Sequence, residues 1–337
     1  MIEHILVLPV LVTFIVTFFI IPSWIKKAHQ IDLMWEDMNK LSKLKVAGSG
    51  GISTLVGFVI GILLYIGLLV FYLKENNNLI EMFSLLTVIL LVGGLGFIDD
   101  LLGWRKGGLS KRTRIVLVAL SSIPLVVINA GKSSILLPLI GNVDLGLIYP
   151  LFLIPLAITG TTTTFNFLAG FNGLEAGQGI FILSALSIVA YLTGHTWLAF
   201  IAICMIASLL AFLIFNFYPA KIFPGDSLTY PIGAMIAIMA ILGNFEKIAM
   251  FFFIPYLIET ILKLRGGLKK YSFGRPKKDN FLELEYDKIY SLNHLAIYLI
   301  NKYNGKANEK KVVLAIWLFQ IFIIVLGFLI FYKGIFI

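Results

Sequence analysis

Long apolar runs dominate this sequence, and they restrict its fold more than any other feature does. A helix needs about 20 predominantly apolar residues to cross the hydrocarbon core of a bilayer. Hydrophobic residues make up 59% of the chain and charged residues 13%, whereas soluble domains carry about 25% charged residues. The sequence therefore predicts an all-α integral membrane protein that forms a single domain over residues 1–337. We expect about ten transmembrane helices, in the runs 5–25, 46–73, 82–98, 115–131, 147–165, 179–193, 197–215, 228–242, 248–264 and 312–332.

Two of these runs leave an alternative open. Run 228–242 is short for a span and is joined to run 248–264 by a brief connection, so the pair could form a re-entrant hairpin. Losing both spans would keep the helix count even, and the other loops would stay on the same sides of the membrane. The first run begins at residue 5 without the basic segment of a secretory signal, so we expect it to be a spanning helix.

Basic residues divide unevenly between the two sides that ten helices would define. One side holds 23 of the 27 Lys and Arg residues, and the other holds only Lys74, Lys132, Lys247 and Lys333. Cytoplasmic loops are the ones rich in Lys and Arg, so we expect both termini to face outward and a long cytoplasmic loop at 265–311. The net charge of +9 then belongs to a face that meets anionic lipid, and we expect no nucleic-acid partner.

Polar residues suited to catalysis are gathered on this basic side. They occur in residues 37–40, 99–100, 166–178 and 216–227. Charged and amide groups at membrane helix ends are costly and usually mark function. We therefore expect one active site on the cytoplasmic face.

The residue types in these segments suit phosphate chemistry. Asp99, Asp100, Asp226 and the amide oxygen of Asn166 are hard oxygen ligands, of the kind that Mg²⁺ binds together with waters and substrate phosphates. Basic side chains follow the aspartate pair, as a phosphate-bearing substrate would require. They are Arg105, Lys106, Lys111, Arg112 and Arg114.

Several of these residues also have a plain structural interpretation. Asp37 could be an ordinary interfacial charge, and Asn166 could satisfy backbone groups at a helix end. Adjacent carboxylates at a helix C-terminus oppose the helix macrodipole, which favours a functional role for Asp99 and Asp100. Glu259, inside the ninth apolar run, has no evident role beyond lining a cytoplasmic cavity.

Four motifs taken together resemble those of one enzyme family. They are Asp-x-Asn-Lys at 37–40, Gly-Phe-Ile-Asp-Asp at 96–100, Asn-Phe-Leu-Ala-Gly-Phe-Asn-Gly-Leu-Glu-Ala-Gly-Gln at 166–178, and Asn-Phe-Tyr-Pro followed by Pro-Gly-Asp-Ser within 216–227. In this order they resemble the polyprenyl-phosphate N-acetylhexosamine-1-phosphate transferases, glycosyltransferase family 4. The third motif is especially similar to the branch that makes dolichyl-diphosphate N-acetylglucosamine for protein N-glycosylation. The resemblance extends over about residues 30–300.

This resemblance implies a ten-helix fold with UDP-N-acetylglucosamine as donor and a polyprenyl or dolichyl phosphate as acceptor. Magnesium is the implied cofactor, with manganese as a substitute, and Asn166 and Asp226 would hold it with the diphosphate. Asp99 and Asp100 would act near the lipid phosphate. Further substrate contacts would come from Asp37, Asn39, Lys40, Gly170, Asn172, Glu175 and Phe223, of which Asn172 would contact the uridine.

The chain departs from the family pattern at three places. The family usually has a lysine where this chain has Arg114, so Arg114 and Lys111 are rival candidates for binding phosphate; arginine keeps the charge but changes the donor geometry. Residues 271–280 contain no histidine, unlike the bacterial peptidoglycan branch, which argues against a muramyl-pentapeptide donor. Gly48 stands where the family usually has an acidic residue. In the last loop, the sugar would be bound by Arg275, Lys277 and Lys278.

Two reaction routes remain open at this stage. The lipid phosphate is largely ionised, because a phosphate monoester has a second pKa of about 6, so its oxygen could attack the β-phosphorus directly. The alternative is a covalent intermediate on Asp99 or Asp100. The nearest functional alternative is the same reaction with another UDP-N-acetylhexosamine or with undecaprenyl phosphate, and the remote one is a lipid-linked sugar transporter.

The compact loop lengths bear on localisation. No large insert separates the last two apolar runs, which favours a prokaryotic, archaeal-type plasma membrane over the endoplasmic reticulum of a eukaryote. For the assembly we consider two alternatives, a monomer and a homodimer.

Overall fold

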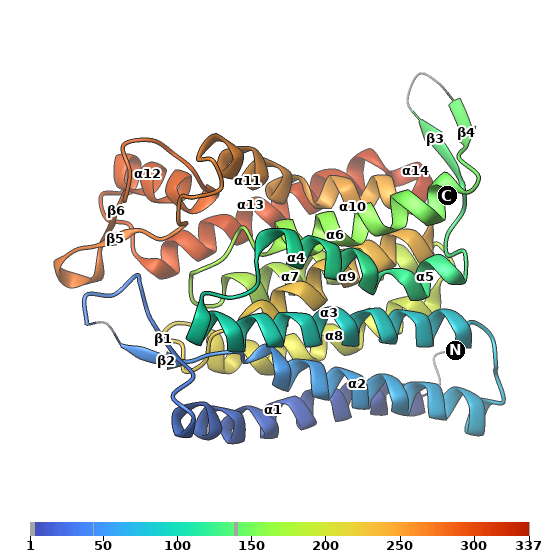
Figure 1. Ribbon diagram of the computed structural model, residues 1–337. Coiled ribbons are helices and arrows are strands. Elements are labelled where there is room, and N and C mark those ends of the chain that lie inside the picture. The colour runs from blue at the N-terminus through green and yellow to red at the C-terminus, as the bar shows by residue number, and fades with distance from the viewer. Residues whose placement is uncertain (1–3, 43, 138–140, 337) are drawn as a thin grey trace.

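The computed structural model describes residues 4–42, 44–137 and 141–336 and is built almost wholly of helices that run along one common direction (Figure 1). The helices are α1 Val7–Gln30, α2 Gly51–Gly67, α3 Leu79–Lys106, α4 Lys111–Ser121, α5 Ile123–Val127, α6 Ile154–Phe165, α7 Leu174–Leu192, α8 Thr196–Asn216, α9 Asp226–Gly243, α10 Glu246–Phe252, α11 Ile254–Arg265, α12 Leu292–Asn304, α13 Glu309–Ile330 and α14 Tyr332–Phe336. The strands form antiparallel pairs, namely β1 Met34–Glu36 with β2 Lys45–Ala47, β3 Ser134–Leu137 with β4 Gly141–Asp144, and β5 Arg275–Pro276 with β6 Leu282–Glu283.

Within the described residues, 7 helices are long and apolar enough to cross a membrane. They are Val7–Gln30, Gly51–Leu73, Leu79–Gly103, Leu174–Leu192, Thr196–Asn216, Asp226–Gly243 and Glu309–Ile330. The predicted class of an all-α, multi-pass membrane protein is therefore confirmed. The short run 228–242 belongs to α9, one of the 7, while the full count of ten spans stays a prediction.

Two of the other three apolar runs form broken helices and the third changes from π- to α-helix, and each of these changes coincides with a proline. Run 115–131 divides between α4 and α5, run 147–165 between a π-helical turn and α6, and run 248–264 between α10 and α11. In each case a proline stands in the first turn of the second helix: Pro124, Pro155 and Pro255. Proline lacks the backbone N–H of a helix interior, and its ring clashes with the preceding turn. A hydropathy pattern does not register such a break.

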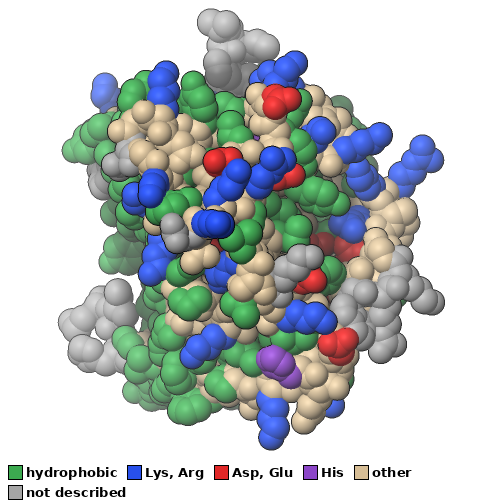
Figure 2. Space-filling view, turned by 90° about the vertical axis from the view of Figure 1, so that its left-hand side faces the viewer, with side chains coloured by type: hydrophobic (Ala, Val, Ile, Leu, Met, Phe, Trp, Pro, Cys, Tyr) green, Lys and Arg blue, Asp and Glu red, His purple; other side chains and the backbone are tan. Residues whose placement is uncertain are grey.

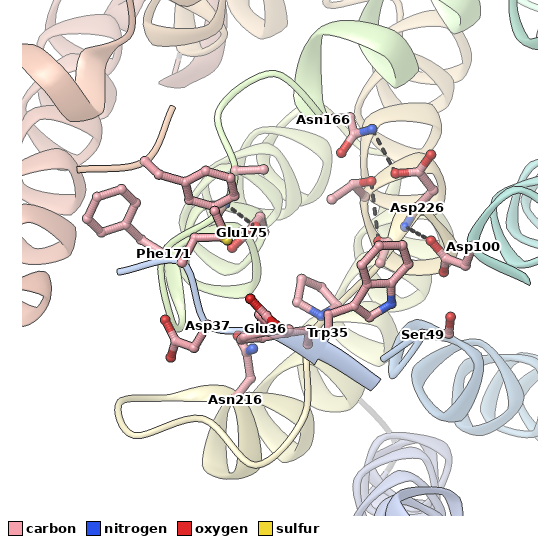
Figure 3. Close-up of a pocket in the computed structure, with 18 of the residues that line it drawn as sticks. Trp35, Glu36, Asp37, Ser49, Asp100, Asn166, Phe171, Glu175, Asn216 and Asp226 are labelled. Atoms are coloured by element: carbon pink, nitrogen blue, oxygen red, sulfur yellow. Dashed lines mark hydrogen bonds between the residues drawn. The ribbon is translucent and has the colours of Figure 1, made fainter. Parts of the chain in front are cut away.

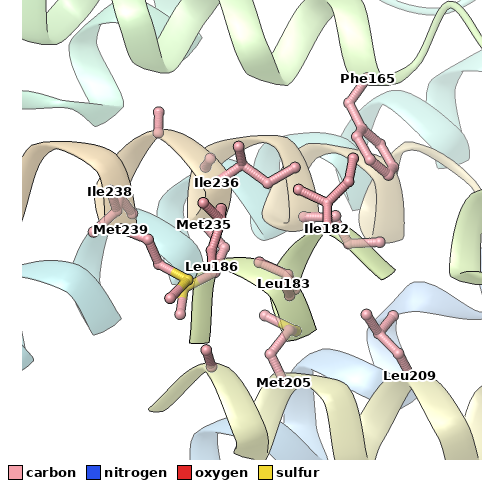
Figure 4. Packing of buried hydrophobic residues seen from close by; sticks show 14 of the residues in the cluster. Phe165, Ile182, Leu183, Leu186, Met205, Leu209, Met235, Ile236, Ile238 and Met239 are labelled. Atoms are coloured by element: carbon pink, nitrogen blue, oxygen red, sulfur yellow. The ribbon is translucent and has the colours of Figure 1, made fainter. Parts of the chain in front are cut away.

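Helix α9 forms the centre of the bundle. It packs against α3, α6, α2 and α7, and all its residues from Ser227 to Gly243 are buried. Figure 4 shows Met235, Ile236 and Met239 of α9 among side chains of α7 and α8. A helix that is surrounded by protein needs no apolar face toward lipid. A short apolar run is therefore sufficient for α9. This central helix carries Asp226 at its first residue.

The two ends of the bundle differ in character. The start of α1 and the end of α13 lie at one end, whereas β1, β2, β5, β6 and α12 lie at the other (Figure 1). Figure 2 looks onto this second end and shows Lys and Arg side chains spread over it. The starts of α7, α9 and α13 reach the same end, so the polar segments of the sequence meet there.

Candidate active site

The first element of the site is Asp100, near the C-terminal end of α3. Its carboxylate accepts hydrogen bonds from the backbone N–H groups of Asp226 (2.8 Å) and Ser227 (3.2 Å) at the start of α9. A carboxylate at a helix N-terminus is favoured by the macrodipole and by the unpaired N–H groups there. Gly225 makes this approach possible, because its φ is +69° and an added Cβ would lie 2.2 Å from Asp100 Oδ2.

Asp99 points its carboxylate to a different partner. Its oxygens accept from Leu109 N (2.6 Å) and lie 2.8 Å from Arg114 Nε. Another nitrogen of Arg114, Nη1, lies 3.8 Å from Asp226 Oδ2. Neighbouring helix residues project about 100° apart, so the aspartate pair separates. Asp99 fixes the arginine, and Asp100 fixes the start of α9.

Asp226 also contacts Asn166, the residue that follows α6. The amide nitrogen of Asn166 donates to Asp226 Oδ1 at 2.8 Å, which leaves the amide oxygen available. Both residues line the cavity described below. The described residues contain no group of three or more His, Cys, Asp and Glu that could hold a metal. One carboxylate and one amide oxygen still suit Mg²⁺, which usually takes few protein ligands and completes its shell with phosphates and water.

The 166–178 segment is held as a tight loop over α7. Gly170 donates its N–H to Glu175 Oε1 (2.8 Å) and accepts from Asn39 Nδ2 (2.7 Å). Its φ is +99°, and an added Cβ would lie 2.5 Å from the ring of Phe273. Glycine is therefore required at position 170 both by the backbone conformation and by the close approach of Phe273.

A second polar cluster surrounds Asp37. Its carboxylate lies 2.6 Å from Lys40 Nζ and accepts from Asn172 Nδ2 at 3.3 Å. The backbone N–H of Asn172 in turn donates to Glu309 Oε1 at 2.7 Å. These contacts join β1–β2, the 166–178 loop and the start of α13, which are far apart in the sequence.

These groups surround a cavity of about 730 Å³, which we call the main cavity. Figure 3 shows Asp37 on one side of it and Asn166, Asp100 and Asp226 on the other. Such a volume is within the range of small-molecule sites. The described lining includes the predicted residues Asp37, Asp100, Asn166, Gly170, Glu175, Phe223 and Asp226.

A smaller cavity of about 350 Å³, the cationic cavity, shares part of this wall. Four basic residues line it, namely Lys111, Arg114, Lys263 and Lys270. It also includes Asn166 together with the apolar Ile115 and Val118 of α4. Because Asn166, Tyr271 and Phe273 line both cavities, the two spaces are neighbours.

Other predicted residues lie beside the cavities rather than on their described walls. Asn39 bridges Gly170 and Gly274, donating to the first carbonyl and accepting from the second N–H at 3.1 Å. Lys40, Asp99 and Asn172 are buried in the contacts given above. Their predicted substrate roles stay predictions, and the structure gives each a role in shaping the site.

The last loop brings different residues to the cavity from those expected. Arg275 and Lys277 lie on the β5–β6 ribbon and pair with Glu285 (3.3 Å) and Glu283 (3.1 Å). With Lys278 they are absent from the described lining of both cavities, whereas Tyr271 and Phe273 line both. The side chains of Arg105 and Lys106 fall outside the described part of the chain.

Sequence reasoning also missed Trp35, Glu36 and Ser49, which line the main cavity. Trp35 and Glu36 immediately precede Asp37, so their place beside a polar motif was the available signal. An added Cβ on Gly48 would lie 2.5 Å from the Trp35 indole. The glycine that replaces the family-typical acid therefore makes room for a tryptophan.

Comparison with known proteins identifies the family of the chain. Residues 82–244 match the sequence profile described as glycosyl transferase family 4. A Saccharolobus solfataricus protein, provisionally named UDP-N-acetylglucosamine–dolichyl-phosphate N-acetylglucosaminephosphotransferase, is 36% identical over 93% of this chain and 92% of its own length. The Dictyostelium discoideum protein of that name is 30% identical over 73% of this chain and 68% of its own length. A Streptococcus pneumoniae phospho-N-acetylmuramoyl-pentapeptide-transferase is 28% identical over 76% and 81%. The chain belongs to glycosyl transferase family 4.

Proposed function

We propose that this protein transfers N-acetylglucosamine-1-phosphate from UDP-N-acetylglucosamine to a polyprenyl phosphate of the dolichyl type, releasing UMP. The names of the relatives at 36% and 30% identity support both substrates. The observation that carries the proposal is the pair of neighbouring cavities. One has the size and polar lining for a nucleotide-sugar, and the other gathers four cations beside apolar residues of α4.

We assign the main cavity to the nucleotide-sugar and the cationic cavity to the lipid phosphate. The donor diphosphate would lie at the start of α9, where Asp226 and Asn166 would hold Mg²⁺ with it. When bound, Mg²⁺ neutralises the diphosphate and the charge that develops on it. Arg114 contacts Asp226 at 3.8 Å and lines the cationic cavity, so its charge is available to both phosphates.

The contacts of the aspartate pair favour direct transfer. Both oxygens of Asp100 are engaged by the N–H groups of α9, and both oxygens of Asp99 are engaged by Leu109 and Arg114. Carboxylates held in this way are poor nucleophiles. An oxygen of the ionised lipid phosphate would instead attack the β-phosphorus. The bond from that phosphorus to the oxygen bridging the two phosphates would break, and UMP would leave with the electron pair.

We further propose ten membrane crossings, with both termini outside and the two cavities at the cytoplasmic face of the plasma membrane. The uneven distribution of basic residues supports this orientation, as does the placement of the termini opposite the site (Figure 1). UDP-sugars are cytoplasmic metabolites, so the donor would reach the main cavity directly.

The proposed activity is tested by release of UMP from purified protein. The assay combines Mg²⁺, dolichyl or undecaprenyl phosphate and a panel of UDP-sugars, with each substrate omitted in turn. We expect UMP only when both substrates are present, and most of it from UDP-N-acetylglucosamine with dolichyl phosphate. If no pair yields UMP while vesicles containing the protein translocate a lipid-linked sugar, the transporter alternative is correct.

Replacing Lys111 with methionine should raise the KM for the lipid phosphate about tenfold, because a hydrogen bond to a charged group is worth about 1.5–3 kcal/mol. Lys111 lines the cationic cavity, and within the described part of the chain its ammonium group makes one long contact, to the Leu268 carbonyl 3.4 Å away. The KM for the UDP-sugar should stay the same. Arg112→Met, an exposed neighbour on the same helix, provides the matched control. An equal rise in both KM values would contradict the assignment of the two cavities.

A further inference from the structure

The residues that line both cavities come from two segments, the 166–170 stretch and an extended segment that follows α11. Residues 268–274, which we call the strap, follow α11 and have no regular secondary structure. Tyr271 and Phe273 of the strap line both cavities. On the proposed function, the strap therefore lies between the nucleotide-sugar and the lipid phosphate. Its position would set how closely the two substrates approach.

The end of the strap is anchored to the 37–40 segment and to α12. Gly274 donates its N–H to Asn39 Oδ1 at 3.1 Å. The carbonyl oxygen of Phe273 lies 3.1 Å from His294 Nε2. The Phe273 ring also packs on Gly170, where an added Cβ would lie 2.5 Å away. These contacts hold the C-terminal end of the strap.

The middle of the strap is held by Lys263, in the last turn of α11. Its ammonium group donates to the Lys270 carbonyl at 3.0 Å and to the Ser272 hydroxyl at 2.5 Å. Ser272 links Lys263 to Phe167, because the Ser272 hydroxyl donates to the carbonyl of Phe167 at 3.3 Å. Phe167 follows Asn166, one of the two residues expected to hold magnesium.

Glu259 completes this arrangement one helical turn earlier on α11. It is fully buried, and its Oε1 lies 3.9 Å from Lys263 Nζ. Its Oε2 accepts from the N–H of Leu292 at 2.6 Å, at the start of α12. The carboxylate therefore joins the helix before the last loop to the helix that ends it. A buried ion pair contributes little to stability by itself, and fixing one arrangement is its better attested use.

The contacts of Lys263 use most of its hydrogen-bonding capacity. An ammonium group has three N–H donors. The carbonyl of Lys270 and the hydroxyl of Ser272 take two of them, and the carboxylate of Glu259 lies 3.9 Å away as an ion-pair partner. The side chain is only 10% exposed although it borders the cationic cavity. Lys263 thus differs from Lys111 and Lys270, which are exposed at the same cavity.

We propose that Lys263 and Glu259 act as positioning residues that fix the strap between the two substrates. Lys263 holds the middle of the strap, and Glu259 holds both Lys263 and the start of α12. The expected effect of these residues on turnover rests on the proposed function, whereas their expected effect on the mobility of the strap does not. It gives Glu259, which the sequence left unexplained, a role outside both cavities.

The test compares strap mobility with kinetics in the same variants. The variants are Lys263→Met, Ser272→Ala and the double substitution Glu259→Gln with Lys263→Met. The double substitution matters because Lys263→Met alone leaves a buried carboxylate without its cation, whereas a glutamine at position 259 would keep an acceptor for the N–H of Leu292. Lys269→Met, which changes an exposed side chain of the strap itself, is the control. Hydrogen exchange of residues 268–274 is measured without substrates, and kcat and both KM values are measured with them.

We expect at least tenfold faster exchange of the strap and an at least tenfold lower kcat in the double variant, with the KM for lipid phosphate changed less than about threefold. Ser272→Ala should shift both quantities in the same direction by less, and its effect should not add to that of Lys263→Met, because both act through one contact. A tenfold rise in the lipid KM with unchanged exchange and kcat would make Lys263 a phosphate ligand and overturn the proposal. Unchanged exchange in every variant would overturn it as well, whether or not the protein proves to be a transferase.

Discussion

Asp226→Asn is expected to lower kcat by roughly 10²–10³-fold, the loss typical of removing one preorganised electrostatic group. Asparagine keeps the shape and one oxygen ligand but removes the charge that would hold Mg²⁺ beside the diphosphate. The concentration of Mg²⁺ that gives half-maximal activity should therefore rise as well. Both quantities follow from UMP release measured over a range of Mg²⁺ concentrations.

The same variant should fold normally. Asp226 lies close to Asp100 and Arg114 in the folded protein, and Asp99 shares that arginine. Asp99 and Asp226 share one guanidinium, and neighbouring carboxylates repel one another, so the free energy of unfolding without substrates should stay equal or increase. Glu283→Gln, on the exposed β5–β6 ribbon, is the matched control. Wild-type activity with unchanged Mg²⁺ dependence in Asp226→Asn would refute the metal assignment.

Arg114 gives the second large effect, and here two substitutions separate charge from geometry. Arg114→Met should lower kcat by roughly 10²–10³-fold, because it removes the cation between Asp99 and Asp226. Arg114→Lys should retain more activity, within about 30-fold of the wild type, since it keeps the charge but loses the contacts that Arg114 Nε makes with Asp99 and the Leu109 carbonyl. UMP release at saturating substrates distinguishes the three proteins.

Arg112→Met is the control for this series, because Arg112 is exposed on the same helix and should be replaceable without loss. Equal activity of Arg114→Met and the wild type would remove Arg114 from the site. In that case Lys111, the rival named from the sequence, would have to supply the charge. Equal loss in the lysine and methionine variants would show that the contact geometry matters more than the charge.

The sequence allowed the centre of the site to be predicted because its residues lie at helix ends. Asp100 follows an apolar run and Asp226 precedes one, so both were expected at the same face of the membrane. The structure joins them through the N–H groups of α9. The separate partners of Asp99 and Asp100 could not be foreseen, since they depend on the direction in which each carboxylate projects from α3.

The walls of the site were harder to predict because they are made by long-range contacts. Tyr271 and Phe273 lie on the strap, which is contacted by Lys263, Asn39 and His294 from distant parts of the sequence. None of these contacts is encoded in local periodicity. The basic residues Arg275 and Lys277 attracted attention by their charge, yet they find acidic partners within their own ribbon. Proline explains why two apolar runs are broken and a third changes its helix type, and that signal was present in the sequence.

The central claim is that the sugar and the β-phosphate move together from the nucleotide to the lipid. It is tested most directly with UDP-N-acetylglucosamine labelled on the β-phosphorus with ³²P and on the sugar with ³H, incubated with the purified protein, Mg²⁺ and dolichyl phosphate. The account predicts that both labels enter the lipid fraction in a one-to-one ratio, with one unlabelled UMP released for each. Transfer of ³H without ³²P, with UDP as the product, would contradict it.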